Sequence, residues 1–431
     1  MRALLEDTIT HMLSKGALTV TPLVLLPLVV VVVALAFRRH MLEAGILGAI
    51  VAMLLGKVGI PAAVDVIMKA IPGMLGTLTP LFYCSVAIVV AKNGGFENLL
   101  KLVRRLIGNR MPLVAAAIVL IQGLATYAAG LGAGNTMVTA PLALAAVGAV
   151  PEMIAGMAIA TAASFETSPA SAESALASKL AGVPVGDYSE MMRPYTYLFW
   201  ALGIALAAWG VWRRGRILKT QEATESGEST GTLFKLALPT LYLITVVVAG
   251  KGLNGMVGWN LFSPVFNVLT TLLLVGICVP GSAKKLSENL IEGSSFILTR
   301  LFAVGLFLGF VNIFEKIGTF QYIANLAISA PTSILVATAA LAGFLVSIAA
   351  GAYTVGVIAL VVPAMAQAGL SPTQIGLVCI AIGFGSQVSL VQINVASLGL
   401  GFKMDIPDVV KNNFRYIPIA LAVLLGIAFF A

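Results

Sequence analysis

The stretch AAGLGAGNT at residues 128–136 interrupts apolar sequence with glycine and polar side chains, and SFETSPASAES at residues 164–174 does so again. The same pair returns later as AAGAYTVG at residues 349–356 and GSQVSLVQINVAS at residues 385–397. Unpaired backbone groups are costly in hydrocarbon, so such segments persist in a membrane only where they are buried in protein or line a water-filled cavity. These four segments are therefore the predicted ligand site.

Composition places the chain among polytopic membrane proteins. Of its 431 residues, 59% are hydrophobic and only 10% are charged, which leaves too little polar surface for a soluble globule. Several apolar runs approach the roughly 20 residues that a helix needs to cross a bilayer. We therefore expect an all-α, multi-pass protein of the plasma (inner) membrane, with the lipid bilayer as its surroundings.

Several classes of function are disfavoured by what the sequence contains. The three cysteines, Cys84, Cys278 and Cys379, fall in predicted spans and have neither metal-ligand nor disulfide spacing. No GxxxxGK[ST] motif is present, which disfavours ATP-driven transport by this chain alone. We predict no enzyme, no cofactor and no metal. The net charge of +8 needs no nucleic-acid partner, because a cytoplasmic excess of Lys and Arg is usual in membrane proteins.

An internal repeat with an offset of about 221 residues runs through the chain. Leu78-Thr79-Pro80-Leu81-Phe82 recurs as Leu298-Thr299-Arg300-Leu301-Phe302, and Pro151 recurs as Pro372. This pattern predicts two halves that share one plan. The expected parts are an N-terminal segment 1–19, a first repeat 20–212, a linker 213–232 and a second repeat 233–431.

Each half is interpreted as five crossings plus one re-entrant hairpin and a broken helix. The hairpins are expected at 111–149 and 331–369, and the broken helices at 152–181 and 372–400. An odd number of crossings inverts the second half relative to the first. Most of the 26 Lys and Arg residues then fall on one side if both termini lie outside, which makes the linker cytoplasmic by the positive-inside rule.

The candidate substrate site combines hydroxyl and amide side chains from both halves with half-helix N-termini, which suit a carboxylate. The predicted substrate-binding residues are Asn135, Thr136, Ser164, Thr167 and Ser168 from the first half, and Tyr353, Thr354, Ser386, Gln387, Ser389 and Asn394 from the second. The structural alternative is that the small residues at the tips serve close helix packing. No Lys or Arg is found near the predicted tips, and Arg193 and Arg300 are interpreted as interface anchors.

Two carboxylates at membrane depth are the candidate coupling-ion site. Glu166 and Glu173 would each be costly there unless they are solvated, paired or protonated. Gln387 and Asn394 occupy the equivalent positions of the second half, so the site is asymmetric in charge. We expect the acidic half to handle a coupling ion, Na⁺ or H⁺.

The order of segments resembles a known family. A hairpin, PLALAAVGAV (141–150), a broken span with a Ser/Thr/Pro-rich centre and VGDYSEMMRPY (185–195) are similar in plan to the anaerobic four-carbon dicarboxylate carriers of the ion transporter superfamily, with a divalent anion/citrate transporter-type fold. The resemblance implies a homodimer with scaffold and transport domains and an elevator mechanism. Gly134-Asn135-Thr136 keeps part of the Ser-Asn-Thr signature of the sodium-coupled branch, whereas Tyr353-Thr354-Val355 departs from it.

These observations predict a secondary active transporter of a small organic anion, expected to be a di- or tricarboxylate. It would work by elevator-like alternating access, coupled to protons or sodium or by exchange. One alternative is a cation/proton antiporter that uses Glu166 and Glu173 as its ion site. A channel or a structural membrane subunit is the other.

Overall fold

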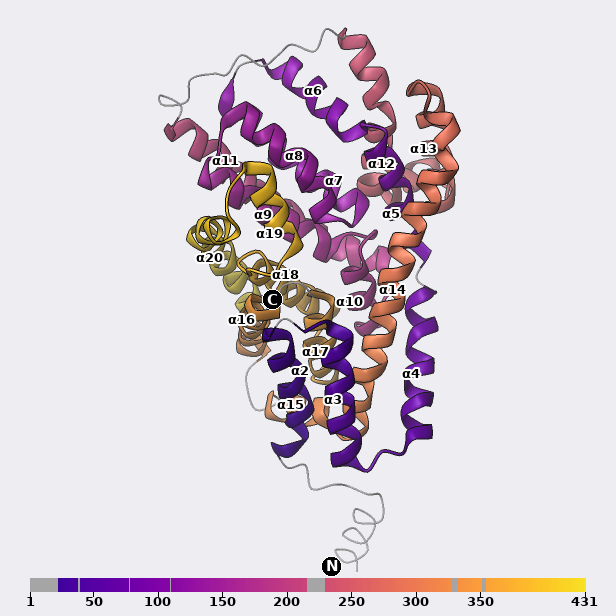
Figure 1. Cartoon of the computed structure of the whole chain (residues 1–431), viewed down its shortest axis with the longest axis vertical. Helices are drawn as coiled ribbons and strands as arrows, with labels where there is room; N and C mark the ends of the chain where they lie inside the picture. The colour runs from indigo at the N-terminus through magenta and orange to yellow at the C-terminus, as the bar shows by residue number, and fades with distance from the viewer. Residues whose placement is uncertain are drawn as a thin grey trace, which may run out of the picture.

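The computed structural model describes residues 22–37, 39–76, 78–108, 110–214, 229–327, 332–350 and 354–431. All regular secondary structure in these ranges is helical (Figure 1). The predicted N-terminal segment 1–19, most of the linker 213–232 and the site residue Tyr353 lie outside the described residues.

The helices of the first half are η1 (Pro22–Leu25), α2 (Leu26–Ala36), α3 (Met41–Gly56), α4 (Ile60–Leu75), α5 (Leu78–Lys92), α6 (Gly95–Ile107), α7 (Met111–Ala129), α8 (Gly132–Val147), α9 (Pro151–Thr167), α10 (Ala172–Leu180) and α11 (Val185–Arg214). Those of the second half are α12 (Thr230–Val257), α13 (Pro264–Cys278), η2 (Ser282–Lys285), α14 (Leu286–Lys316), α15 (Thr319–Ala327), α16 (Thr332–Ala350), α17 (Thr354–Gln367), α18 (Pro372–Ser386), α19 (Ile393–Phe402) and α20 (Ile406–Phe430).

The helix ends follow from local sequence. Helices α9 and α18 both begin with proline in the first turn, where the missing N–H costs nothing. Ser371 and Gln374 add a reciprocal capping box at the start of α18. Pro169 follows the end of α9, and the chain resumes as α10 with the Ser171 hydroxyl accepting from the Ser174 N–H. These helix ends are therefore determined by prolines and capping residues in the local sequence.

The two halves have the same order of helices. Helix α16 begins 221 residues after α7 (332 against 111), and the same offset separates α18 from α9 (372 against 151) and α20 from α11 (406 against 185). The 31-residue α14 stands where the first half has α4 and α5, which are bent by 52°. The opposite membrane orientation of the two halves stays a prediction.

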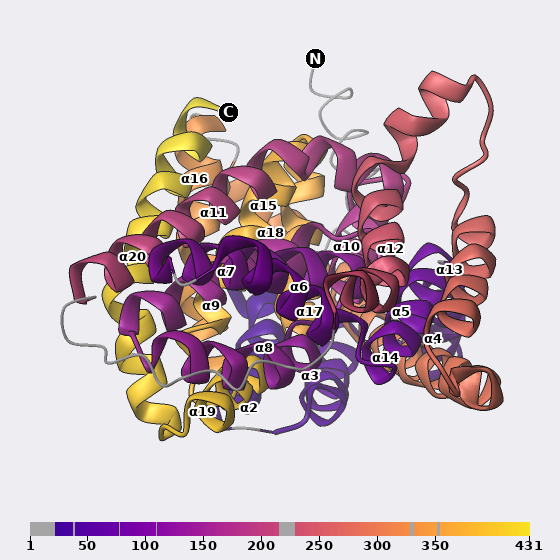
Figure 2. The ribbon, with the colours of Figure 1, turned by 90° about the horizontal axis from the view of Figure 1, so that it is seen from above.

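The helices form two packing groups; seen from above, α4, α5, α12 and α13 lie on one side and α11, α16 and α20 on the other (Figure 2). In the first, α14 packs along α3, α4 and α5, with α2 against α3 and α13 against α12 and α5. In the second, α9 packs against α7, α11, α18 and α20, while α16 packs against α18. Helices α6 and α15 contact both groups. We name them the α14 group and the α9 group.

Five of the described helices are long and apolar enough to cross a membrane, or six if the bent α4–α5 pair counts as one span. They are α7, α11, α12, the segment Ser282–Lys316 and α20. The 19-residue α7 belongs to a predicted re-entrant hairpin, yet its length and composition also suit a crossing helix. Length alone therefore does not test the re-entrant interpretation, and the ten crossings stay a prediction.

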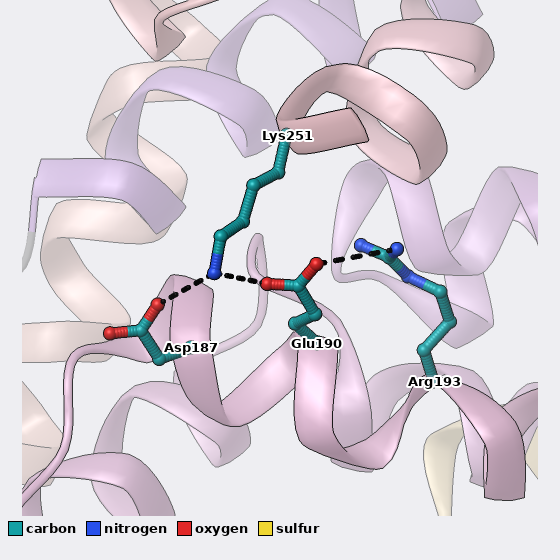
Figure 3. A network of polar contacts seen from close by, with 4 residues as sticks. All are labelled: Asp187, Glu190, Arg193 and Lys251. Carbon is teal, nitrogen blue, oxygen red and sulfur yellow. Dashed lines mark hydrogen bonds and ion pairs between the residues drawn. The ribbon is translucent and has the colours of Figure 1, made fainter. Parts of the chain in front are cut away.

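An exposed ion network joins the two groups at α11 and α12 (Figure 3). The Nζ of Lys251 lies 3.3 Å from Asp187 Oδ1 and also pairs with Glu190, while Arg193 lies 3.7 Å from Glu190. The Lys251 side chain is 63% exposed. Pairs so exposed contribute about 0.2–1 kcal/mol each, so this network adds little to the stability of the contact between the groups.

Three buried cysteines are distributed over both groups. Cys84 on α5 and Cys379 on α18 are fully buried, and Cys278 at the end of α13 is nearly so. None of the three forms a disulfide. Their role in this conformation is packing, as free buried cysteines behave as small hydrophobic side chains.

A buried carboxylate joins three helices of the α9 group. Glu152 Oε1 accepts from the Arg214 guanidinium at 3.2 Å and from the Tyr416 hydroxyl at 2.6 Å. Its side chain is only 1% exposed, and Gly210 lies against it. Burial makes each charge-assisted bond worth more than its surface counterpart.

We expect Glu152→Ala to lower the stability of the folded protein by about 2 to 3 kcal/mol, because it leaves Arg214 and the Tyr416 hydroxyl without their acceptor. Thermal unfolding in detergent measures this effect. The matched control is Glu97→Ala, which removes an exposed i,i+4 pair with Lys101 worth at most about 0.5 kcal/mol. Equal shifts for both variants would contradict a buried anchor.

Candidate functional site

The first hairpin meets the second broken helix through a chain of buried polar side chains. The Thr136 hydroxyl on α8 lies 2.6 Å from Asn394 Oδ1 on α19 and is positioned to donate to it. Asn394 Nδ2 donates in turn to Gln387 Oε1 at 2.6 Å. Helix α8 packs along α19, so polar groups 258 residues apart in sequence share one cluster.

Gln122 on α7 is the centre of this cluster, and sequence reasoning missed it. Its Nε2 lies within donating distance of Thr136 Oγ1 (2.7 Å) and Thr161 Oγ1 (2.9 Å). Its Oε1 accepts from the Thr139 hydroxyl at 2.5 Å. The available signal was a glutamine within an otherwise apolar stretch. The structure buries it fully, and buried polar side chains need partners.

The second hairpin meets the first broken helix in the corresponding way. The Thr354 hydroxyl, at the start of α17, donates to Glu173 Oε1 on α10 at 3.3 Å. Helices α17 and α10 pack together, and α10 also contacts α14. Each hairpin therefore contacts the broken helix of the other half: α8 packs against α19, and α17 packs against α10.

The tip of the first hairpin packs directly against the break between α9 and α10. Gly130 has φ +65, and a Cβ there would lie 2.3 Å from the Ala170 carbonyl oxygen. The Ser168 hydroxyl donates to Tyr127 O at 2.5 Å and accepts from the Ala170 N–H at 2.9 Å. Only glycine fits this approach without displacing backbone.

Ser164 and Thr167 hold α9 to its neighbours. Ser164 Oγ accepts from Trp200 Nε1 at 2.8 Å and lies 2.9 Å from the carbonyl of Gly123. Thr167 and Thr196 share a hydrogen bond at 2.7 Å. Both hydroxyls are fully buried and engaged with protein groups, so in this conformation they orient α9 rather than face a cavity.

Glu166 is a fully buried carboxylate without a hydrogen-bond donor in the described structure. It packs against Gly383 of α18, where a Cβ would lie 2.7 Å from Glu166 Cγ. The Tyr188 hydroxyl donates to its backbone carbonyl at 3.3 Å and leaves the carboxylate unpaired. A buried carboxylate of this kind is costly unless it holds a proton or a cation.

A cavity of about 690 Å³ lies beside the second break, and Ser389 lines it. Lys411 and Arg415 of α20 line the same cavity. The sequence predicted no Lys or Arg near the hairpin tips and made no prediction of cations at the breaks, where the structure brings these two. The cause is tertiary: α20 folds back on the break, where Asn413 Nδ2 donates to Gln387 O at 2.7 Å.

The other predicted residues lie at contacts between the halves, within one tip or break, or at the cavity. Two separate buried contacts join the halves: Thr136 with Asn394 and Gln387, and Thr354 with Glu173. Asn135 bonds the Leu131 carbonyl of its own tip at 2.8 Å, and Ser386 bonds Gly383 O at 2.7 Å. Ser389 faces the cavity.

Two other expectations concern cations and metals. Arg193 pairs with Glu190, and the Arg300 guanidinium stacks 4.9 Å from the Phe296 ring centre. Among the residues that the structure describes, no group of three His, Cys, Asp or Glu side chains has the arrangement of a metal site.

Comparison with known proteins places the fold. The YdaH transporter of Alcanivorax borkumensis superimposes with a TM-score of 0.60 at 15% identity, covering 91% of this chain and 98% of that one. MtrF of Neisseria gonorrhoeae, described as illuminating a class of antimetabolite efflux pumps, gives 0.60 at 13% identity over 91% and 94%. The chain has the fold of membrane transporters.

This transporter fold is the part of the expected family resemblance that the comparisons support. Neither solved structure is described as a dicarboxylate carrier, so the four-carbon dicarboxylate branch is not supported by them. No protein-family model and no curated protein matches the sequence.

Proposed function

We propose that the chain is a secondary active transporter that moves a small organic anion across the plasma (inner) membrane. The observation that carries this proposal is the crossing of the two halves, in which Thr136 bonds Asn394 and Thr354 bonds Glu173. In secondary transporters, discontinuous helices of this kind commonly form the substrate and ion sites. The likeness of the fold to two solved transporters supports the same class.

Alternating access in this proposal is an elevator-like movement of the α9 group along the α14 group. Helices α7, α9, α16 and α18 belong to the α9 group, and α8, α10, α17 and α19 pack against helices of that group, so the site would travel as one body. Helices α10 and α17 also contact α14 and would slide along it. The exposed ion network between α11 and α12 would break and re-form in each cycle. We further propose that two copies of the chain form a homodimer and that each copy contains two inverted repeats. Both termini would lie outside, and the linker 213–232 would be cytoplasmic.

Glu166 and Glu173 are the proposed coupling site, for H⁺ or Na⁺. Glu166 supports this role because it is buried without a partner, and Glu173 because it contacts the opposite hairpin through Thr354. The same unpartnered carboxylate favours the second candidate, a cation/proton antiporter. The two candidates differ in whether an organic anion is moved, with di- and tricarboxylates the first class to test.

We expect Asn135→Ala and Thr354→Ala to abolish uptake of radiolabelled substrate into proteoliposomes, because both remove buried polar groups at the hairpin tips. Expression and dimerisation should be unchanged. The substrate is first found by thermal shift of the purified protein with succinate, citrate and benzoate, each with and without sodium, since ligands stabilise the state they bind.

The control for this test is Thr299→Ala on α14, whose exposed hydroxyl bonds only the Ser295 carbonyl of its own helix at 2.8 Å. It should transport as the wild type does. Unchanged substrate affinity and uptake in both tip variants would remove the assignment. Sodium movement driven by a pH gradient, without any carboxylate, would favour the antiporter instead.

A further inference from the structure

The cavity beside the second break lies between the two packing groups. The end of α2 contributes Ala36 from the α14 group, whereas Ser389, Leu390 and residues of α16 and α20 belong to the α9 group. Its volume of about 690 Å³ is within the usual range of small-molecule sites, about 300–1,000 Å³. It is therefore large enough for a small organic molecule.

Two cations at this cavity have no partner. Lys411 and Arg415 are four residues apart, on one face of α20, and neither belongs to an ion pair within the described chain. No described residue that lines the cavity is acidic. Asp408 is one turn before Lys411 on α20 and makes no ion pair with it. Unneutralised positive charge at a concave site recruits anions.

The position of this charged pair is fixed by the second break. Asn413 lies between Lys411 and Arg415 in sequence and is fully buried. Its Nδ2 bonds Gln387 O at 2.7 Å, and Gln387 belongs to the cluster that joins the two halves. The two cations are exposed, and they lie on a helix that is bonded to the buried cluster through Asn413.

The rest of the lining decides the class of anion. Apart from Ser389 and the two cations, every lining residue is apolar, with Phe414 and Leu390 among the largest. A compact dianion such as succinate would leave this surface without a partner. A carboxylate with an apolar body satisfies both parts, since Lys and Arg donate charge-assisted bonds to the headgroup and the apolar wall buries the remainder.

We propose that this cavity binds an amphipathic monocarboxylate, its headgroup between Lys411 and Arg415 and its apolar body along Phe414 and Leu390. The inference rests on the proposed function, because it makes this anion the class of substrate that the transporter takes up or releases at this face. It replaces the expected di- or tricarboxylate with a monocarboxylate.

The test uses full-length protein purified in neutral detergent, with benzoate and hexanoate as probes and succinate and citrate as competitors of the other class. Isothermal titration should give binding of the two monocarboxylates that is tighter than binding of succinate or citrate. Lys411→Gln and Arg415→Gln should each weaken benzoate binding about 10-fold or more, the loss expected for a charge-assisted hydrogen bond.

The matched control is Lys284→Gln, which removes an exposed lysine on η2, away from the cavity. It should bind benzoate as the wild type does, and circular dichroism verifies that all variants are folded. Tighter binding of succinate or citrate, or benzoate binding that is unchanged in Lys411→Gln and Arg415→Gln, would overturn the proposal.

An anionic lipid offers the same chemistry, so a second arm separates the two sources. Nanodiscs of phosphatidylcholine alone are compared with nanodiscs that contain phosphatidylglycerol. Benzoate binding at equal affinity in both supports the proposal. Retention of phosphatidylglycerol by the wild type but not by Arg415→Gln, without benzoate binding, would assign the cavity to lipid. If the cavity fails in this way while Asn135→Ala still abolishes uptake, the proposed transport function survives alone.

Discussion

Glu166→Gln should abolish gradient-driven uptake while leaving the protein as stable as the wild type or more so. The carboxylate is fully buried and accepts no hydrogen bond in the described structure, so as a charge it costs free energy that a neutral amide of the same shape does not. If it carries the coupling ion, a side chain that cannot exchange a proton or hold a cation removes coupling.

The measurement compares two assays in proteoliposomes. Gradient-driven uptake should fall to the level of empty vesicles, whereas exchange of labelled for unlabelled substrate at zero gradient should persist, because it needs no net movement of the ion. Glu288→Gln, an exposed carboxylate in the first turn of α14, is the control. Normal gradient-driven uptake by Glu166→Gln would exclude this residue as the coupling site, and a lower Tm would show that the carboxylate stabilises the fold.

Gly130→Ala should lower stability and stop transport together. Gly130 has φ +65, a conformation that costs an alanine about 1 kcal/mol. The added methyl would also lie 2.3 Å from the Ala170 carbonyl oxygen and 2.6 Å from the Ser171 nitrogen. Both are backbone atoms, so the hairpin tip must withdraw from the break, and we expect a total loss of more than about 2 kcal/mol.

The same tip supplies the control. Gly134 lies within α8, and a Cβ there would meet no atom within 4 Å. Gly134→Ala should therefore gain up to about 1 kcal/mol from helix propensity. Thermal unfolding in detergent and uptake into proteoliposomes are measured for both variants. Equal behaviour of the two would mean that contact between tip and break has no part in transport.

The class of the fold and many helix ends were predictable because they depend on local sequence. Composition alone excludes a soluble globule. Helices α9 and α10 occupy the range expected for a broken helix at 152–181 because Pro169 cannot continue a helix and Ser171 caps the next one. Glycine at 130 likewise ends α7 in the left-handed conformation.

The partners of the site were not predictable, because they depend on tertiary contacts. Gln122 lies in the apolar first arm of the hairpin and became the centre of the cluster only when α8 and α9 packed against it. From the sequence, Lys411 and Arg415 were interpreted only as part of the cytoplasmic excess of basic residues. In the structure, they line the cavity beside the second break because α20 packs there. Ser164 and Thr167 were chosen for residue type, which does not reveal that Trp200 and Thr196 engage them.

The burial of all three native cysteines gives the protein a chemical background suited to labelling. A maleimide reacts with exposed thiolates, so a cysteine introduced at an exposed position such as Lys251 should be modified long before Cys84, Cys278 or Cys379. Single-site reporters can then be introduced without first replacing the native thiols. Cys84 and Cys379 lie in different packing groups, so the onset of their modification during turnover would show which group exposes its interior.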